Sequence, residues 1–90
     1  MDKVIAGQIA DAKLQEFLKK DSATIKNLLT ESEHEFIVRN SIEYQLRINA
    51  FYDDNRSKRA GKIRVMVTVD DQGFWSTFAP LSRSDFYYFN

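Results

Sequence analysis

The stretch FYDDNRSKRAGK (51–62) has the strongest ionic character in the chain. Its cationic side chains are Arg56, Lys58, Arg59 and Lys62. Asp53 and Asp54 precede them and leave a local charge of +2, with Arg64 directly beyond. Clustered cations bind phosphate oxygens, and a nearby aromatic residue such as Phe51 can stack on an unpaired base. A second interpretation is that this stretch is only the solvated tip of a hairpin, since hairpin tips lie in water and their cations discourage unwanted edge pairing. We favour the solvated tip over a phosphate-binding site.

Titratable and nucleophilic residues elsewhere form no recognisable site. His34 is the sole histidine and lies among glutamates in ESEHE (31–35). A zinc site usually needs three or four firm ligands, which this stretch does not supply. Ser82, Ser84 and Asp85 have no nucleophile motif or neighbouring base. The three glycines are isolated, so no phosphate-binding loop is predicted. We therefore expect a non-enzyme without cofactor or metal.

Composition narrows the class of protein. The chain has 90 residues, which suits one domain over 1–90, and its 13 basic and 13 acidic residues cancel. Nucleic-acid binders usually carry a basic excess, which is missing here. The sequence contains no cysteine and no apolar run long enough for a signal peptide or a membrane span. The expectation is a cytoplasmic, soluble protein without membrane contact.

The first third of the chain, about 3–30, has helical spacing. Apolar residues between Ala6 and Leu18 recur every three or four positions and predict a helix over 3–20. DSATIKNLL (21–29) restarts the pattern with Asp21 or Ser22 as its cap. A second helix and a continuation of the first both fit; we favour a break near Asp21.

The period then changes to two, which predicts a β-meander over about 36–80. Apart from Asn40, apolar residues take the even positions from Phe36 to Tyr52, and this predicts one long, half-buried strand bent near Asn40–Ser41. Further strands are expected at 62–70 and 74–79. Helices followed by a meander indicate the α+β class: one or two N-terminal helices on a three-stranded antiparallel sheet, or four-stranded if the tail adds a strand.

Matching the buried positions sets the register. Ile48 opposite Val67 makes the loop run from Asp53 to Lys62. The following DDQG turn, closed with a glycine bulge, pairs Val69 with Trp75 and buries Trp75 under the helices. A two-residue turn would expose Trp75 instead; we favour the bulge.

The predicted strand 74–79 has large apolar groups on both sides, so the second face of the sheet needs a cover. The aromatic C-terminal segment 81–90, a second copy of the chain and another protein are the three candidates. Four aromatics in a row, 86–89, alternate sides in an extended segment, so one pair can pack while the other stays exposed.

Two functional hypotheses follow. The first is a non-catalytic protein–protein interaction module that uses an aromatic sheet face or the free strand edge at 36–41, with a partner protein or a homodimer as the assembly. Its expected contact residues are Phe51, Met66, Phe74 and Phe78, with Arg47 and Arg64 at the rim. The alternative is a single-stranded nucleic-acid-binding domain that uses Arg56, Lys58, Arg59 and Lys62 with the same face.

Overall fold

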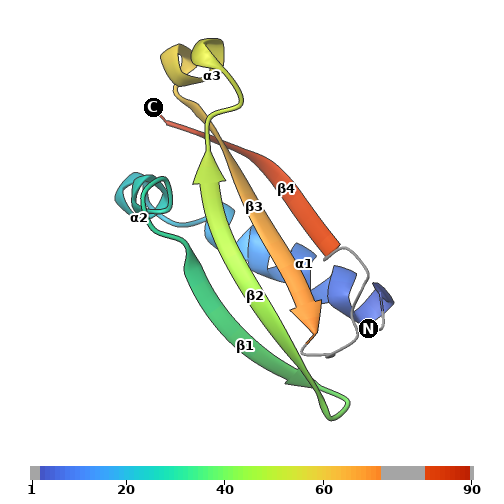
Figure 1. Cartoon of the computed structure of the whole chain (residues 1–90). Coiled ribbons are helices and arrows are strands. Elements are labelled where there is room, and N and C mark those ends of the chain that lie inside the picture. The colour runs from blue at the N-terminus through green and yellow to red at the C-terminus, as the bar shows by residue number, and fades with distance from the viewer. Residues whose placement is uncertain (1–2, 72–80, 90) are drawn as a thin grey trace.

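The computed structural model describes residues 3–71 and 81–89. Its elements, in chain order, are α1 (Lys3–Leu18), α2 (Ser22–Asn27), β1 (Glu33–Arg39), β2 (Ile42–Phe51), α3 (Asn55–Ala60), β3 (Lys62–Asp71) and β4 (Leu81–Tyr88). The strands form one antiparallel sheet in the order β1-β2-β3-β4. In Figure 1, α1 crosses behind β3 and β4, so one side of the sheet is covered by helix. This arrangement confirms the α+β class.

The helices follow the predicted pattern. The buried side of α1 carries Ala6, Ile9, Ala10, Leu14 and Phe17. The predicted break is confirmed at Asp21, whose carboxylate Oδ1 accepts the backbone N–H of Thr24 at 3.0 Å and caps α2. Gly7 lets α1 approach β4 closely, since a Cβ at this position would lie 3.2 Å from the guanidinium of Arg83.

The long strand predicted for 36–52 is wrong: the segment is a hairpin. Asn40 and Ser41 have φ angles of 51° and 64°, and Arg39 pairs with Ile42 on either side of them. Positive φ at both central residues defines a type I′ turn, the two-residue turn whose twist matches that of the flanking strands. The chain therefore reverses where we expected only a bend.

This turn also changes which residues are buried. Because Arg39 and Ile42 are directly opposite, odd positions of β1 share a face with even positions of β2. Phe36 and Val38, which the alternation predicts on the half-buried side, thus lie on the opposite side and are 61% and 66% exposed. The free edge expected at 36–41 is correspondingly limited to the outer edge of β1, since its other edge pairs with β2.

The predicted β2–β3 register is confirmed, with Leu46, Ile48 and Ala50 opposite Val69, Val67 and Val65. The segment between these strands is not a simple loop, however. Asn55–Ala60 form α3, capped by Asp54, whose Oδ1 accepts the backbone N–H of Ser57 at 2.8 Å. Gly61 ends the helix with φ 69°, in the left-handed region that suits glycine.

The C-terminal segment forms β4 beside β3 and does not lie across the sheet as a cover. Leu81 pairs with Val69, so β4 takes the position beside β3 that we expected for the strand 74–79. That predicted strand, with Trp75, lies outside the described residues. The alternation of the last aromatics is confirmed: Tyr87 and Phe89 pack against the core, with ring centroids 5.3 Å apart, while Tyr88 is 63% exposed.

The core lies between α1, α2 and one side of the sheet. We call this side the covered face and the other the open face. Buried strand residues of the covered face are Tyr44, Leu46, Ile48, Ala50, Ile63, Val65, Val67 and Val69. β2 and β3 thus contribute a continuous apolar surface to the helices.

Tyr44 provides a test of this packing. Its side chain is fully buried, and its hydroxyl has no hydrogen-bond partner among the residues that the structure describes. Because an unpaired buried hydroxyl destabilises the fold, Tyr44→Phe should raise the free energy of unfolding by about 1 kcal/mol. Urea denaturation measures the change. In the matched control, Tyr87→Phe, the lost hydroxyl donates to the Lys20 carbonyl at 2.8 Å, so stability should fall. Equal losses in both variants would contradict this account.

Candidate functional site: the open face of the sheet

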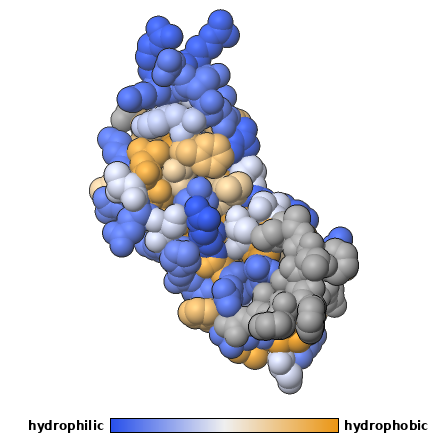
Figure 2. Space-filling view, in the orientation of Figure 1, coloured by the Kyte–Doolittle hydropathy of each residue, from blue (hydrophilic) through white to orange (hydrophobic). Residues whose placement is uncertain are grey.

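The open face is built from alternate residues of all four strands. Its members are His34, Phe36, Val38, Glu43, Gln45, Arg47, Asn49, Phe51, Lys62, Arg64, Met66, Thr68, Asp70, Ser82, Ser84, Phe86 and Tyr88. Figure 2 looks onto this side: apolar atoms gather near the α3 end, and hydrophilic residues separate them from further apolar atoms toward the β1–β2 turn. The face is thus a mixed surface of aromatic, aliphatic and charged groups.

Arg64 organises the α3 end of the open face. Its Nε and Nη2 donate to the two carboxylate oxygens of Asp53 at 2.8 and 2.9 Å, and its Nη1 donates to the Ser84 hydroxyl at 2.9 Å. The guanidinium carbon lies 4.3 Å from the Phe86 ring centroid, and the Lys62 ammonium lies 4.0 Å from it. We call these five residues the Arg64 cluster. It presents an aromatic ring in contact with two cations, one of which is held in place by a bidentate ion pair.

The ion pair shifts the acidity of both partners. The hydrogen bonds from Arg64 hold the pKa of Asp53 below its usual value of 3.8, and the same bonds raise the pKa of Arg64. Asp53 therefore stays ionised at neutral pH and offsets one of the cations beside Phe86. Both side chains remain about 30% exposed, so the pair lies within reach of a ligand.

The open face brings together the predicted contact residues that the structure describes. Phe51 lies directly opposite Arg64, Met66 is opposite Asn49, and exposed Arg47 is opposite Thr68. The other two predicted contacts, Phe74 and Phe78, lie outside the described residues.

Sequence reasoning did not select Phe86, Tyr88, Phe36 or Val38 as contact residues. For Phe86 and Tyr88 the signal was present in the alternation of the C-terminal aromatics. Phe86 and Tyr88 lie on one side of β4, with ring centroids 6.5 Å apart. For Phe36 and Val38 the pattern pointed to the wrong face, because the turn at Asn40–Ser41 went unrecognised.

The cations predicted for nucleic-acid binding divide between two positions. Arg56, Lys58 and Arg59 are exposed on α3, beyond the end of the sheet. Lys62 begins β3 and turns onto Phe86. The α3 end of the open face is thus positive, whereas two acidic residues, Glu43 and Asp70, lie toward its other end.

The other polar residues considered from the sequence serve local contacts. Neighbouring strand positions alternate sides, so His34 lies on the open face and Glu35 on the covered side, where Lys13 bonds it at 2.9 Å. Ser84 accepts from Arg64, and Asp85 accepts the Phe86 backbone N–H at 2.7 Å. No group of three side chains able to hold a metal ion is found within residues 3–71 and 81–89.

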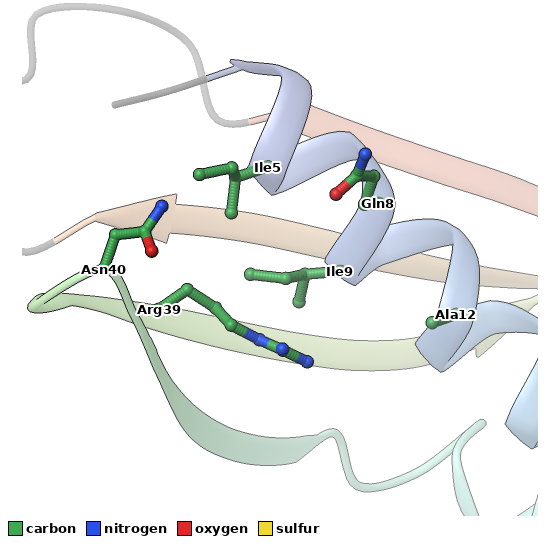
Figure 3. A pocket seen from close by; sticks show the side chains of 6 residues that line it. All are labelled: Ile5, Gln8, Ile9, Ala12, Arg39 and Asn40. Atoms are coloured by element: carbon green, nitrogen blue, oxygen red, sulfur yellow. The ribbon is translucent and has the colours of Figure 1, made fainter.

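A shallow pocket lies on the other side of the sheet, between α1 and the β1–β2 turn. It measures about 400 Å³ and is lined by Ile5, Gln8, Ile9, Ala12, Arg39 and Asn40. Figure 3 shows the Arg39 side chain extending beneath Ile9 toward α1. Among the described lining residues, Arg39 alone is charged and it is itself exposed, so this part of the lining does not present the convergent buried polar groups of a catalytic site.

Comparison with protein-family models, curated proteins and solved structures finds no match for this chain. Within the described residues, no helix combines the length and apolarity needed to cross a membrane. Function is therefore inferred from the open face itself.

The Asp53–Arg64 pair predicts a specific pH response. Because the pKa of folded Asp53 lies below 3.8, the pair stabilises the fold above that pH, and its contribution disappears as pH falls through the lowered value. Arg64→Gln should return the Asp53 pKa toward 3.8, as measured by carboxyl-carbon NMR titration. Asp21 is the internal control, because its pKa is lowered by hydrogen bonds from the Thr24 hydroxyl and backbone N–H and should not move. An unchanged Asp53 pKa in Arg64→Gln would show that the pair does not form in solution.

Proposed function

We propose that this protein is a non-catalytic protein–protein interaction module whose open face binds another protein. The observation that carries the proposal is the exposure of large apolar side chains on one continuous side of the sheet. Phe36, Val38, Phe51 and Tyr88 all lie there, and the described residues place no helix or strand over them. An apolar sheet surface that remains in water favours association with a partner.

The kind of residue on this face supports a protein partner. Aromatic residues, Met and Arg are enriched at the centres of protein interfaces, and this face carries Phe51, Phe86, Met66 and Arg47. The Arg64 cluster adds a pre-ordered group, since its ion pair and ring contacts already fix the side chains that a partner would meet. Less side-chain entropy is then lost on binding. The lack of cysteine in the sequence fits work in a reducing compartment such as the cytoplasm.

The charges of the face suggest what the partner must offer. Lys62, Arg64 and the α3 cations make one end positive, while Glu43 and Asp70 make the other end negative. A partner surface with acidic groups at the α3 end and apolar groups over Phe51 and Met66 would fit this distribution. Such complementarity sets orientation and association rate more than affinity.

The test compares matched surface variants. The open-face variant, Phe51→Ser with Met66→Ser, removes apolar contacts of the open face. The α1 variant, Gln15→Ser with Lys19→Ser, changes two exposed positions, one on α1 and one directly after it. The wild type and the α1 variant should capture a partner that the open-face variant does not. In calorimetry, this partner should bind the purified wild type at least tenfold more tightly than it binds the open-face variant. Equal binding by all three proteins would contradict the proposal. Circular dichroism checks that the variants remain folded.

The second candidate function is binding of single-stranded nucleic acid. The observation favouring it is that α3 places Arg56, Lys58 and Arg59 at the same end of the molecule as Phe86, whose ring is contacted by Lys62 and Arg64. Cations that follow a phosphate backbone next to an exposed aromatic ring are typical of such sites. Against it, Asp53 already pairs with Arg64, and the whole chain has no basic excess. We therefore rank it below a protein partner.

A salt-dependent titration tests this second candidate. The wild type should bind a fluorescent oligothymidine with micromolar or tighter affinity, and the affinity should fall steeply with added salt. Replacing Arg56, Lys58 and Arg59 by Gln should reduce the log–log salt slope by about 2, since each lost phosphate contact on a single strand removes roughly 0.7. Lys19→Gln with Lys20→Gln, at the end of α1, is the control and should leave the slope unchanged. Absence of salt-dependent binding by the wild type would eliminate nucleic acid.

A further inference from the structure

We propose that the outer edge of β1 pairs with β1 of a second copy of this chain, antiparallel and about a two-fold axis at Phe36. The two four-stranded sheets would join into one continuous eight-stranded sheet. This inference concerns an edge of the sheet, and it goes beyond the binding of a partner by the open face. It is carried by the free backbone of β1, by the order of charges along it and by its exposed apolar side chains.

The backbone of β1 offers the required hydrogen-bonding groups. β1 is an end strand, so among the described residues it has a strand neighbour on one side alone. Arg39 and Ile42 flank the two-residue turn and form its hydrogen-bonded pair, so alternate residues of β1 direct their N–H and C=O groups away from β2. These outward residues are His34, Phe36 and Val38. An antiparallel neighbour must match outward residues with outward residues, and a two-fold axis at Phe36 does this for all three.

The charges of β1 are complementary to themselves in this register. The strand reads EHEFIVR, with Glu33 at one end and Arg39 at the other. With Phe36 opposite Phe36 of the second copy, Glu33 lies opposite Arg39 of the second copy, and the symmetry repeats this pair at the far end. Both side chains are exposed, and neither has an ion-pair partner within the described part of the chain. Opposite charges directly across two strands stabilise the pairing.

The apolar side chains of the edge gain cover in the same arrangement. Phe36 and Val38 are 61% and 66% exposed on the monomer. The two-fold axis places the two Phe36 rings side by side on the open face and puts each Val38 opposite His34 of the second copy. A free strand edge that carries exposed apolar side chains favours strand addition. At the other edge of the sheet the charge pattern differs, because Arg83 of β4 is already paired with Asp11 of α1 at 3.4 Å.

Cysteine cross-linking tests both the dimer and its register. The chain has no native cysteine, so each variant carries a single thiol. In the proposed dimer the two Phe36 Cα atoms are about 5.5 Å apart, within disulfide range, whereas the two Val38 Cα atoms are about 14 Å apart. Under mild oxidation Phe36→Cys should form a covalent dimer at least tenfold faster than Val38→Cys. These two positions are matched in strand, face and exposure, so equal rates would overturn the register.

Charge reversal tests the ion pairs independently. Light scattering and sedimentation of the wild type from about 1 µM to about 1 mM cover the range of weak specific association and should show a concentration-dependent dimer. Glu33→Arg and Arg39→Glu each place like charges opposite at both ends of the pairing and should weaken the dimer by about tenfold. The double variant, with both reversals, restores opposite charges and should recover wild-type dimerisation. Failure of recovery while circular dichroism shows a folded chain would overturn the proposal.

The outcomes also separate this inference from the proposed function. A wild type that stays monomeric up to the highest concentration overturns the β1 pairing, and binding of a partner by the open face would be unaffected. A dimer that persists unchanged in Glu33→Arg and in Phe36→Lys would overturn it as well, because association would then use another surface. If the β1 dimer forms but no partner protein is found whose binding depends on Phe51 and Met66, the proposed function alone is overturned.

Discussion

The arrangement of this protein depends on the two-residue turn at Asn40–Ser41. Both residues adopt positive φ angles, which non-glycine residues rarely do, and they make Arg39 and Ile42 direct neighbours. A strand that merely bent at this point would have kept Phe36 and Val38 on the helix side with Tyr44 and Leu46. The turn instead places them on the open face and makes β1 an end strand. The exposure of Phe36 and Val38 and the free edge of β1 are therefore consequences of one local conformation, whereas Phe51 and Tyr88 lie on the open face independently of it.

The parts of the fold that the sequence predicts well are those where burial alone decides the conformation. Ile63, Val65, Val67 and Val69 alternate strictly, and a shift of one residue would turn all of them into water, so the β2–β3 register follows from the pattern. The turn could not be predicted in this way. The turn Asn40–Ser41 contains no glycine. The apolar alternation stops at Asn40 and resumes at Ile42, again at even positions, so it looks the same for one bent strand as for two paired strands.

The segment 53–62 shows a different limit. Its cations suggested a solvated tip, yet its ends carry the marks of a helix: Asp54 accepts a backbone N–H at the start, and Gly61 takes a left-handed conformation at the end. The polar composition obscured these signals because none of the residues 55–60 shows an apolar stripe. Likewise Asp53, counted simply as an opposing charge, fixes Arg64 against Phe86. Composition identified the charged region, whereas its geometry depended on capping and pairing that charge counts do not capture.

The open face and the β1 edge are physically linked, because the side chains that extend over one also border the other. Phe36 and Val38 lie on the open face but belong to the end strand, so pairing of two β1 strands would join two open faces into one surface with the Phe36 rings at its centre. The two Arg64 clusters would then lie on opposite sides of the two-fold axis, each beside its own α3. A partner that repeats its binding groups could engage both copies, and its second contact would form without a further loss of translational freedom. Pairing through an edge strand thus turns a modest sheet surface into a bivalent one.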